Sequence, residues 1–253
     1  MMDRRQRTVL VTGGARRIGA AITRYLAGCG HRVIIHYGSS RDEAEALARE
    51  IEGHAVAADL ADRTAVANLI DEAAVLAGTP VDGLVNCASQ FEFDSPPLDD
   101  WTLFERLAPV NLGAPVLLAS ALAGQAGLAD GVVVNLLDQK VANLNPDFFS
   151  YTCTKVALAG ATEMLARALA PAIRVNAVAP GLTLPSGGQS EAEFEVVARE
   201  NLLRRPVAID DIGRAVDFLL TAPSVTGQTL FVDCGQRFLQ RDGDVMFETR
   251  ERP

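Results

Sequence analysis

The chain has few cysteines and histidines, and neither set has the spacing of metal ligands. Its 253 residues include four scattered cysteines without a Cys-x-x-Cys pair, namely Cys29, Cys87, Cys153 and Cys234. Scattered cysteines are typical of free thiols in a reducing compartment rather than of a disulfide framework. The three histidines fall in the first quarter of the chain without a His-Glu-x-x-His motif, at His31, His36 and His54. We therefore expect no metal site.

The chain also lacks an excess of positive charge. Its formal net charge of −9 disfavours binding to nucleic acids or to anionic membrane surfaces. A basic start, Met1 to Arg7, precedes an apolar run, Val9 to Val11, that is too short for a signal peptide. We see no charge-free run of membrane-spanning length. We expect a cytoplasmic protein that acts on a small molecule, with no nucleic-acid partner and no membrane.

Short apolar runs alternate with longer helix-like segments along the whole chain, of which 49% is hydrophobic. The expected strands cover residues 8–12, 32–36, 54–58, 81–86, 131–136, 173–178 and 229–232. The expected helices cover residues 16–27, 41–52, 62–77, a pair over about 98–123, then 148–170 and 209–220. Runs such as Val132 to Val134 are apolar throughout, which indicates a parallel sheet buried on both faces.

This alternation predicts an α/β fold of the Rossmann type, with a doubly wound, seven-stranded parallel sheet in a single domain over residues 1–253. A long segment rich in Gly, Pro and Ser begins at Pro180, and we place a substrate loop at about 180–205. Long loops in compact domains are usually functional lids or disordered. The tail, about 236–253, is polar around Val245 to Phe247, and its pattern assigns no structure to it.

A glycine-rich stretch, Thr12 to Gly19, follows the first strand and opens the first helix. Gly13 lets the backbone turn sharply and approach a pyrophosphate, while the helix N-terminus supplies N–H donors. The spacing is not Gly-x-Gly-x-x-Gly, because Arg17 stands where the longer motif has its middle glycine. The stretch predicts a dinucleotide site that includes Gly13, Arg17 and Ile18, with a plain glycine-rich turn as the alternative.

The end of the second strand has no carboxylate before Asp42. Folds that bind NAD usually place Asp or Glu here for the ribose hydroxyls. Serine hydroxyls and an arginine follow instead, which suits a 2′-phosphate and favours NADP(H). The alternative is a serine helix cap beside a solvated arginine. The residues assigned to this end of the cofactor are His36, Tyr37, Ser39, Ser40 and Arg41.

Three further stretches follow expected strands. Small residues at Asn86-Cys87-Ala88-Ser89 let the chain pass close to a cofactor ribose. Phe91 follows them, and it either stacks on a flat ring or packs in the core. Asp138 comes directly after the fifth strand, and Pro180-Gly181-Leu182 forms a rigid turn after the sixth.

Tyr151 and Lys155 stand four residues apart on an expected helix, and therefore on the same face. A nearby ammonium favours the phenolate, so we expect Lys155 to lower the pKa of Tyr151 towards the range of a proton donor. Alone, such a pair is common on solvated helix faces. The glycine stretch and the strand that ends before Asp138 favour a functional interpretation.

Together these motifs resemble those of the short-chain dehydrogenases/reductases over nearly the whole chain. The matching stretches are Thr12 to Gly19, Asn86 to Ser89, Tyr151 with Lys155, and Pro180 with Gly181. The resemblance implies that Asn111 supports a proton-relay water and that Asp59, with its neighbour Leu60, lies near the adenine. It also implies a homotetramer.

Asp138 stands where this family normally has a catalytic serine, which donates a hydrogen bond to a carbonyl oxygen that becomes negative. A carboxylate there would repel the oxyanion by on the order of a few kcal/mol, which disfavours simple ketone chemistry. A carboxyl group suits a substrate whose ring nitrogen is gripped and protonated while a C=N bond is reduced. Arg17, Cys87 and Ser89 also depart from the usual family motifs.

These departures resemble the pteridine reductases and dihydromonapterin reductases within the family. The resemblance implies that Ser89 and Ala88 touch the cofactor, that Phe91 and the nicotinamide sandwich a pterin ring, and that Lys155 holds the ribose. The implied substrate site comprises Arg17, Phe91, Asp138, Tyr151 and Leu182. The implied catalytic residues are Tyr151, Lys155, Asp138 and Asn111.

We interpret the protein as an NADPH-dependent reductase that transfers hydride to a C=N bond of a pterin-like N-heterocycle, of the dihydropterin or dihydrofolate class. One alternative is a short-chain reductase of another carbonyl or imine substrate. A second alternative is a non-catalytic, NADP(H)-binding regulatory protein, against which the intact Tyr151, Lys155 and Asn111 argue.

Overall fold

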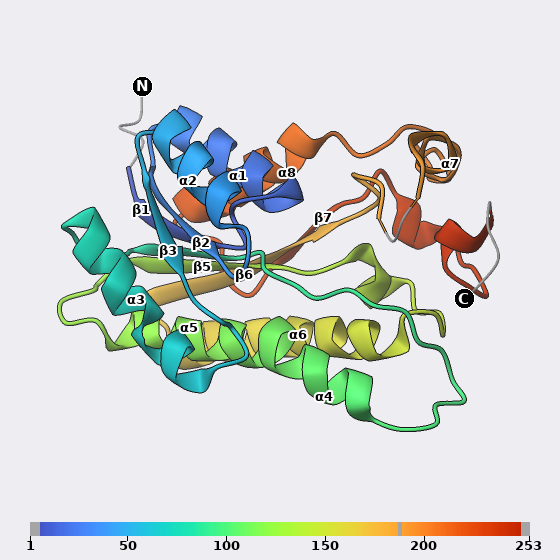
Figure 1. Ribbon diagram of the computed structural model, residues 1–253, viewed down its shortest axis with the longest axis horizontal. Coiled ribbons are helices and arrows are strands. Elements are labelled where there is room, and N and C mark those ends of the chain that lie inside the picture. The colour runs from blue at the N-terminus through green and yellow to red at the C-terminus, as the bar shows by residue number, and fades with distance from the viewer. Residues whose placement is uncertain (1–5, 187–188, 249–253) are drawn as a thin grey trace.

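The computed structural model describes residues 6–186 and 189–248, in which seven parallel strands form one sheet in the order β3-β2-β1-β4-β5-β6-β7 (Figure 1). The strands are β1 (Thr8–Thr12), β2 (Arg32–Tyr37), β3 (His54–Ala57), β4 (Gly83–Asn86), β5 (Gly131–Leu136), β6 (Ile173–Pro180) and β7 (Thr229–Val232). The predicted fold class, a doubly wound parallel α/β sheet, is confirmed.

Helices cover both faces of the sheet (Figure 1). One face carries α1 (Arg17–Gly28), α2 (Arg41–Glu50) and α8 (Ile209–Thr221). The other carries α3 (Arg63–Ala77), α4 (Thr102–Ala108), α5 (Ala114–Gly124) and α6 (Phe149–Ala168). Between α4 and α5 lies η1 (Pro109–Gly113), and after β5 lies η2 (Gln139–Ala142). Beyond the sheet edge lie α7 (Glu191–Val197), η3 (Gln236–Phe238) and η4 (Val245–Glu248).

The central strands are buried on both sides because successive side chains of a strand point to opposite faces. Leu10 and Val133 belong to the apolar cluster under α3 and α5. Val9 and Val134 belong to the cluster under α1 and α8. Each of these side chains is fully buried, and such burial contributes roughly 1.5–3 kcal/mol per side chain. Two apolar clusters, one on each face, therefore hold the sheet between its two layers of helices.

The sheet positions a site at its carboxyl edge. The chain runs from β1 outwards to β2 and β3, and then returns to β4 on the other side of β1. At such a reversal of strand order the loops after neighbouring strands part and leave a crevice. The segments that follow β1, β4, β5 and β6 meet there, and all the catalytic candidates except Asn111 lie on or beside these segments.

The expected pair of helices over 98–123 is one helical path from Thr102 to Gly124. Pro109 has no N–H for the ladder, and the path continues through the π-helical turn η1. Contrary to our expectation from the sequence, this path is long and apolar enough to cross a membrane. Its Leu107, Leu118 and Leu122 are fully buried against the rest of the protein, as in the core helix of a globular domain.

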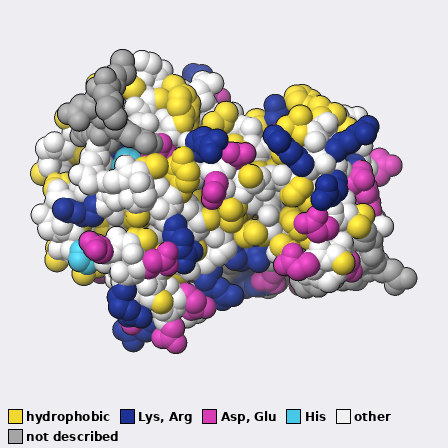
Figure 2. All heavy atoms as spheres, turned by 90° about the horizontal axis from the view of Figure 1, so that it is seen from above, with side chains coloured by type: hydrophobic (Ala, Val, Ile, Leu, Met, Phe, Trp, Pro, Cys, Tyr) yellow, Lys and Arg dark blue, Asp and Glu magenta, His cyan; other side chains and the backbone are white. Residues whose placement is uncertain are grey.

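Two short elements lie in segments that we expected to be loop or tail. The helix α7 lies inside the expected substrate loop, and a capping box between Ser190 and Glu193 starts it. That Ser-x-x-Glu signal is present in the sequence. The turn η4 lies in the tail, with Val245 and Met246 buried. Acidic and basic side chains intermingle over the upper face of the molecule (Figure 2).

Candidate active site

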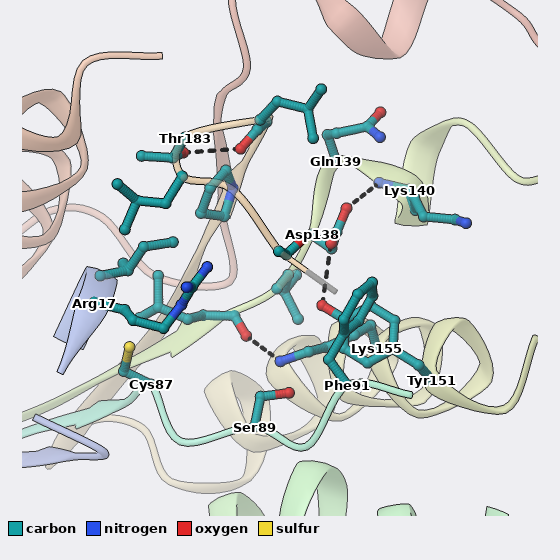
Figure 3. A pocket seen from close by; sticks show the side chains of 18 of the residues that line it. Arg17, Cys87, Ser89, Phe91, Asp138, Gln139, Lys140, Tyr151, Lys155 and Thr183 are labelled. Carbon is teal, nitrogen blue, oxygen red and sulfur yellow. Dashed lines mark hydrogen bonds between the residues drawn. The ribbon is translucent and has the colours of Figure 1, made fainter. Parts of the chain in front are cut away.

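A cavity of about 680 Å³ opens at the carboxyl edge of the sheet. Figure 3 labels some of the side chains that line it. Twelve residues assigned to the site from the sequence belong to its lining: Gly13, Arg17, Ile18, Ala88, Ser89, Phe91, Asp138, Tyr151, Lys155, Pro180, Gly181 and Leu182. They come from the turn after β1, the loop after β4, the end of β5, the helix α6 and the turn after β6.

The turn after β1 accepts only glycine at two positions. Gly13 has a φ of +62°, and a Cβ there would lie 2.9 Å from the backbone of Ala88. A Cβ on Gly19 would lie 2.1 Å from the carbonyl oxygen of Gly13, so any side chain would force the turn open. Arg17 also has a left-handed backbone, with a φ of +53°. A strained non-glycine residue of this kind is common at functional sites.

His36 fixes this turn to the sheet instead of reaching the cavity. Its side chain is 2% exposed, and its Nδ1 accepts a hydrogen bond from the N–H of Gly13 at 3.1 Å. Its Nε2 lies 3.1 Å from the carbonyl oxygen of Ala58, which requires the neutral tautomer that carries its proton on Nε2. Burial lowers the pKa of His36 and outweighs the bond to Ala58, which raises it.

Arg17 links the glycine turn to the expected substrate loop. Its Nη2 donates to the carbonyl oxygen of Pro185 at 2.6 Å, across the mouth of the cavity. Arg16 lines the same end of the cavity. The two guanidinium groups and the N-terminus of α1 give this end of the cavity a positive potential that suits phosphate.

Asp138 and Tyr151 form a hydrogen-bonded pair inside the cavity (Figure 3). The Tyr151 hydroxyl donates to Oδ2 of Asp138 at 3.1 Å, and the N–H of Lys140 donates to Oδ1 at 2.9 Å. Asp138 is half-buried in the cavity wall. Burial raises the pKa of its carboxyl, although the Lys140 contacts and the Tyr151 bond lower it. The carboxyl group therefore lies against the phenol, in the position for which the resemblance implies a serine hydroxyl in simple ketone reductases.

The expected effect of Lys155 on Tyr151 is wrong for this geometry. The Lys155 Nζ donates to the carbonyl oxygen of Leu136 at 2.9 Å and lies 5.6 Å from the centre of the Tyr151 ring. Burial and the neighbouring Asp138 carboxylate raise the pKa of Tyr151 well above its usual value. Burial lowers the pKa of Lys155 to about 8, which shows how much this enclosed site disfavours charge.

Phe91 and Tyr151 form an aromatic wall of the cavity, and Phe148 and Phe247 pack with them outside the cavity lining. Phe91 stacks on Phe148 with ring centres 4.3 Å apart, and its ring meets Tyr151 edge-on at 4.8 Å. Phe247, from the tail, stacks on Phe148 at 5.9 Å. Phe91 therefore lines the cavity and also packs against an apolar cluster, and its stacking on a flat ring of a ligand stays a prediction.

Asn111 lies behind the cavity wall, in the π-helical turn η1. Its Oδ1 accepts bonds from the N–H of Gln90 at 2.8 Å and from Ser89 Oγ at 3.2 Å. Its Nδ2 donates to the Gln90 carbonyl oxygen at 2.9 Å and to Thr154 Oγ1 at 3.2 Å. Asn111 therefore fixes the loop that carries Ser89 and Phe91 to α6, and its assigned role in a proton relay stays a prediction.

The structure keeps several assigned cofactor residues away from the cavity wall. Eight of the residues assigned to the cofactor, all within the described part of the chain, lie outside the lining of the cavity: His36, Tyr37, Ser39, Ser40, Arg41, Asp59, Leu60 and Asn86. Asn86 is 2% exposed and donates to Asn135 Oδ1 at 2.8 Å between β4 and β5, so its amide holds the sheet. Leu60 lies in the apolar core under α3.

The other residues of this group lie at the carboxyl ends of β2 and β3. Ser40 is the N-cap residue of α2, and within the described chain its hydroxyl makes no capping hydrogen bond. Arg41 is exposed and pairs with Glu45 at 3.0 Å. Asp59 is exposed and accepts from the N–H of Ala61 at 2.9 Å. Their contacts with a cofactor stay predictions.

Sequence reasoning missed one side of the cavity. Asp244, Val245 and Met246, from the tail, line it, and so do Lys140 and Cys87. Two signals could have drawn attention to this side. The chain has only two lysines, Lys140 and Lys155, and both line the cavity. The apolar run at Val245 to Phe247 interrupts an otherwise polar tail.

The described residues offer neither a reactive thiol in the cavity nor a metal site. Burial raises the pKa of the Cys87 thiol to about 11, which favours the protonated thiol over the thiolate at neutral pH. Within residues 6–186 and 189–248 no group of three or more His, Cys, Asp or Glu side chains could hold a metal ion.

Comparison with known proteins assigns the family. A family model described as enoyl-(acyl carrier protein) reductase matches residues 13–237, which is most of the chain. The chain belongs to the short-chain dehydrogenase/reductase family. The resemblance inferred from the glycine stretch, Tyr151 and Lys155 is thereby confirmed, and the protein is an oxidoreductase of this family.

Three relatives of this family member are informative. The structure of FolM alternative dihydrofolate reductase 1 from Brucella canis, in complex with NADP, is 43% identical, with a TM-score of 0.88, and covers 92% of this chain and 95% of that one. The dihydromonapterin reductase of Klebsiella pneumoniae is 28% identical over 93% of this chain and 99% of its own. The NADPH-dependent aldehyde reductase 2, chloroplastic, of Arabidopsis thaliana is 31% identical over 90% and 93%.

Proposed function

We propose that the protein is an NADPH-dependent reductase that reduces a C=N bond of a dihydropterin- or dihydrofolate-like heterocycle. The observation that carries this proposal is the Asp138 carboxyl hydrogen-bonded at 3.1 Å to the Tyr151 hydroxyl inside the cavity. The likeness to FolM from Brucella canis and to dihydromonapterin reductase supports it. The substrate would then be a small heterocycle enclosed between the aromatic wall and the glycine turn.

The residues of the cavity, together with the start of α2 outside its lining, fit NADPH. Gly13 and Gly19 leave the backbone bare at the N-terminus of α1, where N–H groups and two arginines suit a pyrophosphate. Ser40 and Arg41 at the start of α2 suit a 2′-phosphate, and Lys155 lies in the wall where the ribose is expected. When bound, this cofactor supplies the hydride.

The protein's own residues supply the proton. Burial raises the pKa of Asp138, so its carboxyl keeps a proton closer to neutral pH than an exposed aspartate does. The pKa of Tyr151 is raised well above its usual value, so the phenol alone is a weak donor. We therefore assign Asp138 as the proton donor to a ring nitrogen, with its proton replaced from solvent after turnover, while Tyr151 orients the carboxyl through the hydrogen bond at 3.1 Å. Lys155 keeps the pair positioned through the end of β5.

Reduction of another carbonyl or imine is the second candidate function. A protonated Asp138 could donate a hydrogen bond to a developing oxyanion, as the usual serine does, and its raised pKa favours that form. The likeness to the Arabidopsis aldehyde reductase supports this alternative.

One assay separates these functions. Purified protein is given NADPH or NADH with dihydrobiopterin, dihydromonapterin, dihydrofolate, simple aldehydes and acetoacetyl esters, and cofactor oxidation is followed at 340 nm. The proposal predicts turnover with the dihydropterins or dihydrofolate and a preference for NADPH. Turnover of carbonyls alone would establish the second function, and cofactor binding without turnover of any compound would indicate a regulatory protein.

We also propose that the protein acts in the cytoplasm as a homotetramer. The exposed Leu117 on α5, and Val156 and Met164 on α6, support self-association through these helices. Light scattering coupled to size-exclusion chromatography measures the mass directly. A Met164→Glu variant is expected to form smaller species, and a wild-type monomer would refute the assembly.

A further inference from the structure

Lys140 is buried beside Asp138 and joins three segments. Its side chain is 4% exposed, and its backbone N–H donates to Asp138 Oδ1 at 2.9 Å. Its Nζ donates to Asn145 Oδ1 at 3.0 Å and to the Asp147 carbonyl oxygen at 2.7 Å. The same ammonium lies 5.3 Å from the centre of the Phe148 ring. A cation with this many partners is held in one position.

The fourth partner of this ammonium comes from the tail. Asp244 Oδ2 lies 2.9 Å from the Lys140 Nζ, and its side chain is 13% exposed. The N–H of Asp244 donates to Asp147 Oδ2 at 2.7 Å, and its Oδ1 accepts from the N–H of Met246 at 3.0 Å. The tail is therefore held at the site by an enclosed ion pair, and the next two residues, Val245 and Met246, also line the cavity.

We infer that Lys140 and Asp244 are positioning residues that set the proton affinity of the Asp138–Tyr151 pair, so the C-terminal segment is part of the catalytic centre. Both residues line the same cavity as the pair, and Lys140 contacts Asp138 directly. This inference rests on the proposed function, in which Asp138 carries the proton. It adds two charged residues that the sequence motifs did not include.

The two charges act on Asp138 in opposite directions. The charged or titratable groups that face the Asp138–Tyr151 pair are Lys140 from η2, Asp244 from the tail, Lys155 from α6 and Cys87 from the segment after β4. The Lys140 ammonium lowers the pKa of Asp138, and the Asp244 carboxylate raises it. The Asp244 carboxylate also raises the pKa of Tyr151. Because the two groups neutralise each other at 2.9 Å, removal of either one leaves the other to act alone.

The test is the pH dependence of kcat/KM in variants that remove one charge or both. Activity requires the proton on the pair, so it falls as pH rises through the pKa of the pair. In Asp244→Asn this fall should move to lower pH, and in Lys140→Met to higher pH, each by on the order of one unit. The double variant removes both opposing charges without leaving one unpaired, and its profile should lie near that of the wild type.

A matched control uses a second ion pair of the same tail. Arg241 pairs with Glu200 at 3.1 Å and with Glu248, away from the cavity lining. Arg241→Met should loosen the tail without a change of charge beside Asp138, so its pH profile should keep the wild-type midpoint. Lys140→Arg retains the positive charge and should restore the midpoint that Lys140→Met displaces.

A direct titration separates this inference from the proposed function. Carboxyl ¹³C resonances of labelled aspartates report the titration of Asp138 without turnover, with Asp138→Asn as the assignment variant. Opposite displacements in Asp244→Asn and Lys140→Met support the inference even where the wild type reduces only carbonyls. Displacements of the same sign, no displacement, or an equal displacement in Arg241→Met would overturn it. Absence of dihydropterin turnover in the wild type would refute the proposed function instead.

Discussion

His36 should make both the stability of the fold and the geometry of the glycine turn sensitive to acidic pH. In His36→Leu the Gly13 N–H and the Ala58 carbonyl oxygen lose their buried partner, and each unsatisfied group costs about 1–3 kcal/mol. The free energy of unfolding should therefore fall by roughly 2–6 kcal/mol, a large share of the roughly 5–15 kcal/mol typical of a domain. Urea unfolding followed by circular dichroism at pH 7.5 measures the change. NADPH affinity should fall as well, because the glycine turn loses its attachment.

The pH dependence follows from the lowered pKa of His36. The unfolded chain binds a proton at this histidine below about pH 6.5, where the folded protein still keeps it neutral. Unfolded molecules therefore bind more protons, and stability falls as pH drops from about 6.5 towards the folded pKa, with a limiting slope of about 1.4 kcal/mol per pH unit. Protonation places a hydrogen on Nδ1, which then faces the N–H of Gly13 and can no longer accept its hydrogen bond.

A non-titrating variant and an exposed histidine complete this experiment. His36→Asn keeps an acceptor near Nδ1 and should lose this part of the pH slope, while His54→Gln, at an exposed position of β3, should keep it. The buried His31 remains in all the variants, so its contribution cancels in the comparison. An unchanged slope between pH 5 and 7 in His36→Asn would refute the assignment of acid sensitivity to this residue.

Three further predictions concern the cavity. Tyr151→Phe should lower turnover by orders of magnitude and leave the NADPH dissociation constant nearly unchanged, and Asp138→Ser should lose dihydropterin turnover. Steady-state kinetics measure the turnover of both variants, and fluorescence titration measures their NADPH affinity. An unchanged rate in either variant would contradict the role assigned to that residue. Arg41→Asp should weaken NADPH more than NADH, and equal losses would count against the 2′-phosphate site. Met246→Ala should destabilise the protein by about 2–5 kcal/mol and raise the KM of the substrate, because its buried side chain packs in the cavity wall; a stable variant with an unchanged KM would place this residue outside the site.

The sheet could be predicted from the sequence because its signals are local. Runs such as Val132 to Val134 mark strands buried on both faces, and the expected and observed bounds of β1, β5 and β7 coincide. The helix α7 was missed although Ser190 and Glu193 supply a capping box, because a run of Gly, Pro and Ser directly before it indicated a loop. The π-helical turn at Pro109 was missed because pattern reasoning treats a proline as a break between helices.

The catalytic residues could be named from the sequence, but their electrostatics could not. Tyr151 and Lys155 share a helix face, as predicted, yet the pKa of Tyr151 moves opposite to the expected direction. Burial is the main cause of this shift, and the partners that add to it come from other parts of the chain. The Asp138 carboxylate lies 3.1 Å from the phenol and raises the pKa further, while the carbonyl oxygen of Leu136 accepts the hydrogen bond of the ammonium. Spacing along one helix cannot reveal these distances.

The tail shows the same limit at longer range. The Lys140–Asp244 ion pair joins residues 104 positions apart, and the polar sequence around Asp244 indicates solvent rather than burial. A charged Asp244 beside Asp138 would cost folding free energy without a cation to neutralise it, and Lys140 supplies that cation. Removal of either residue therefore leaves an uncompensated, enclosed charge. The Asp138 carboxyl group therefore has a second pair of charges beside it, whose two members compensate each other. In this chain the C-terminal segment contributes the anionic half of that pair.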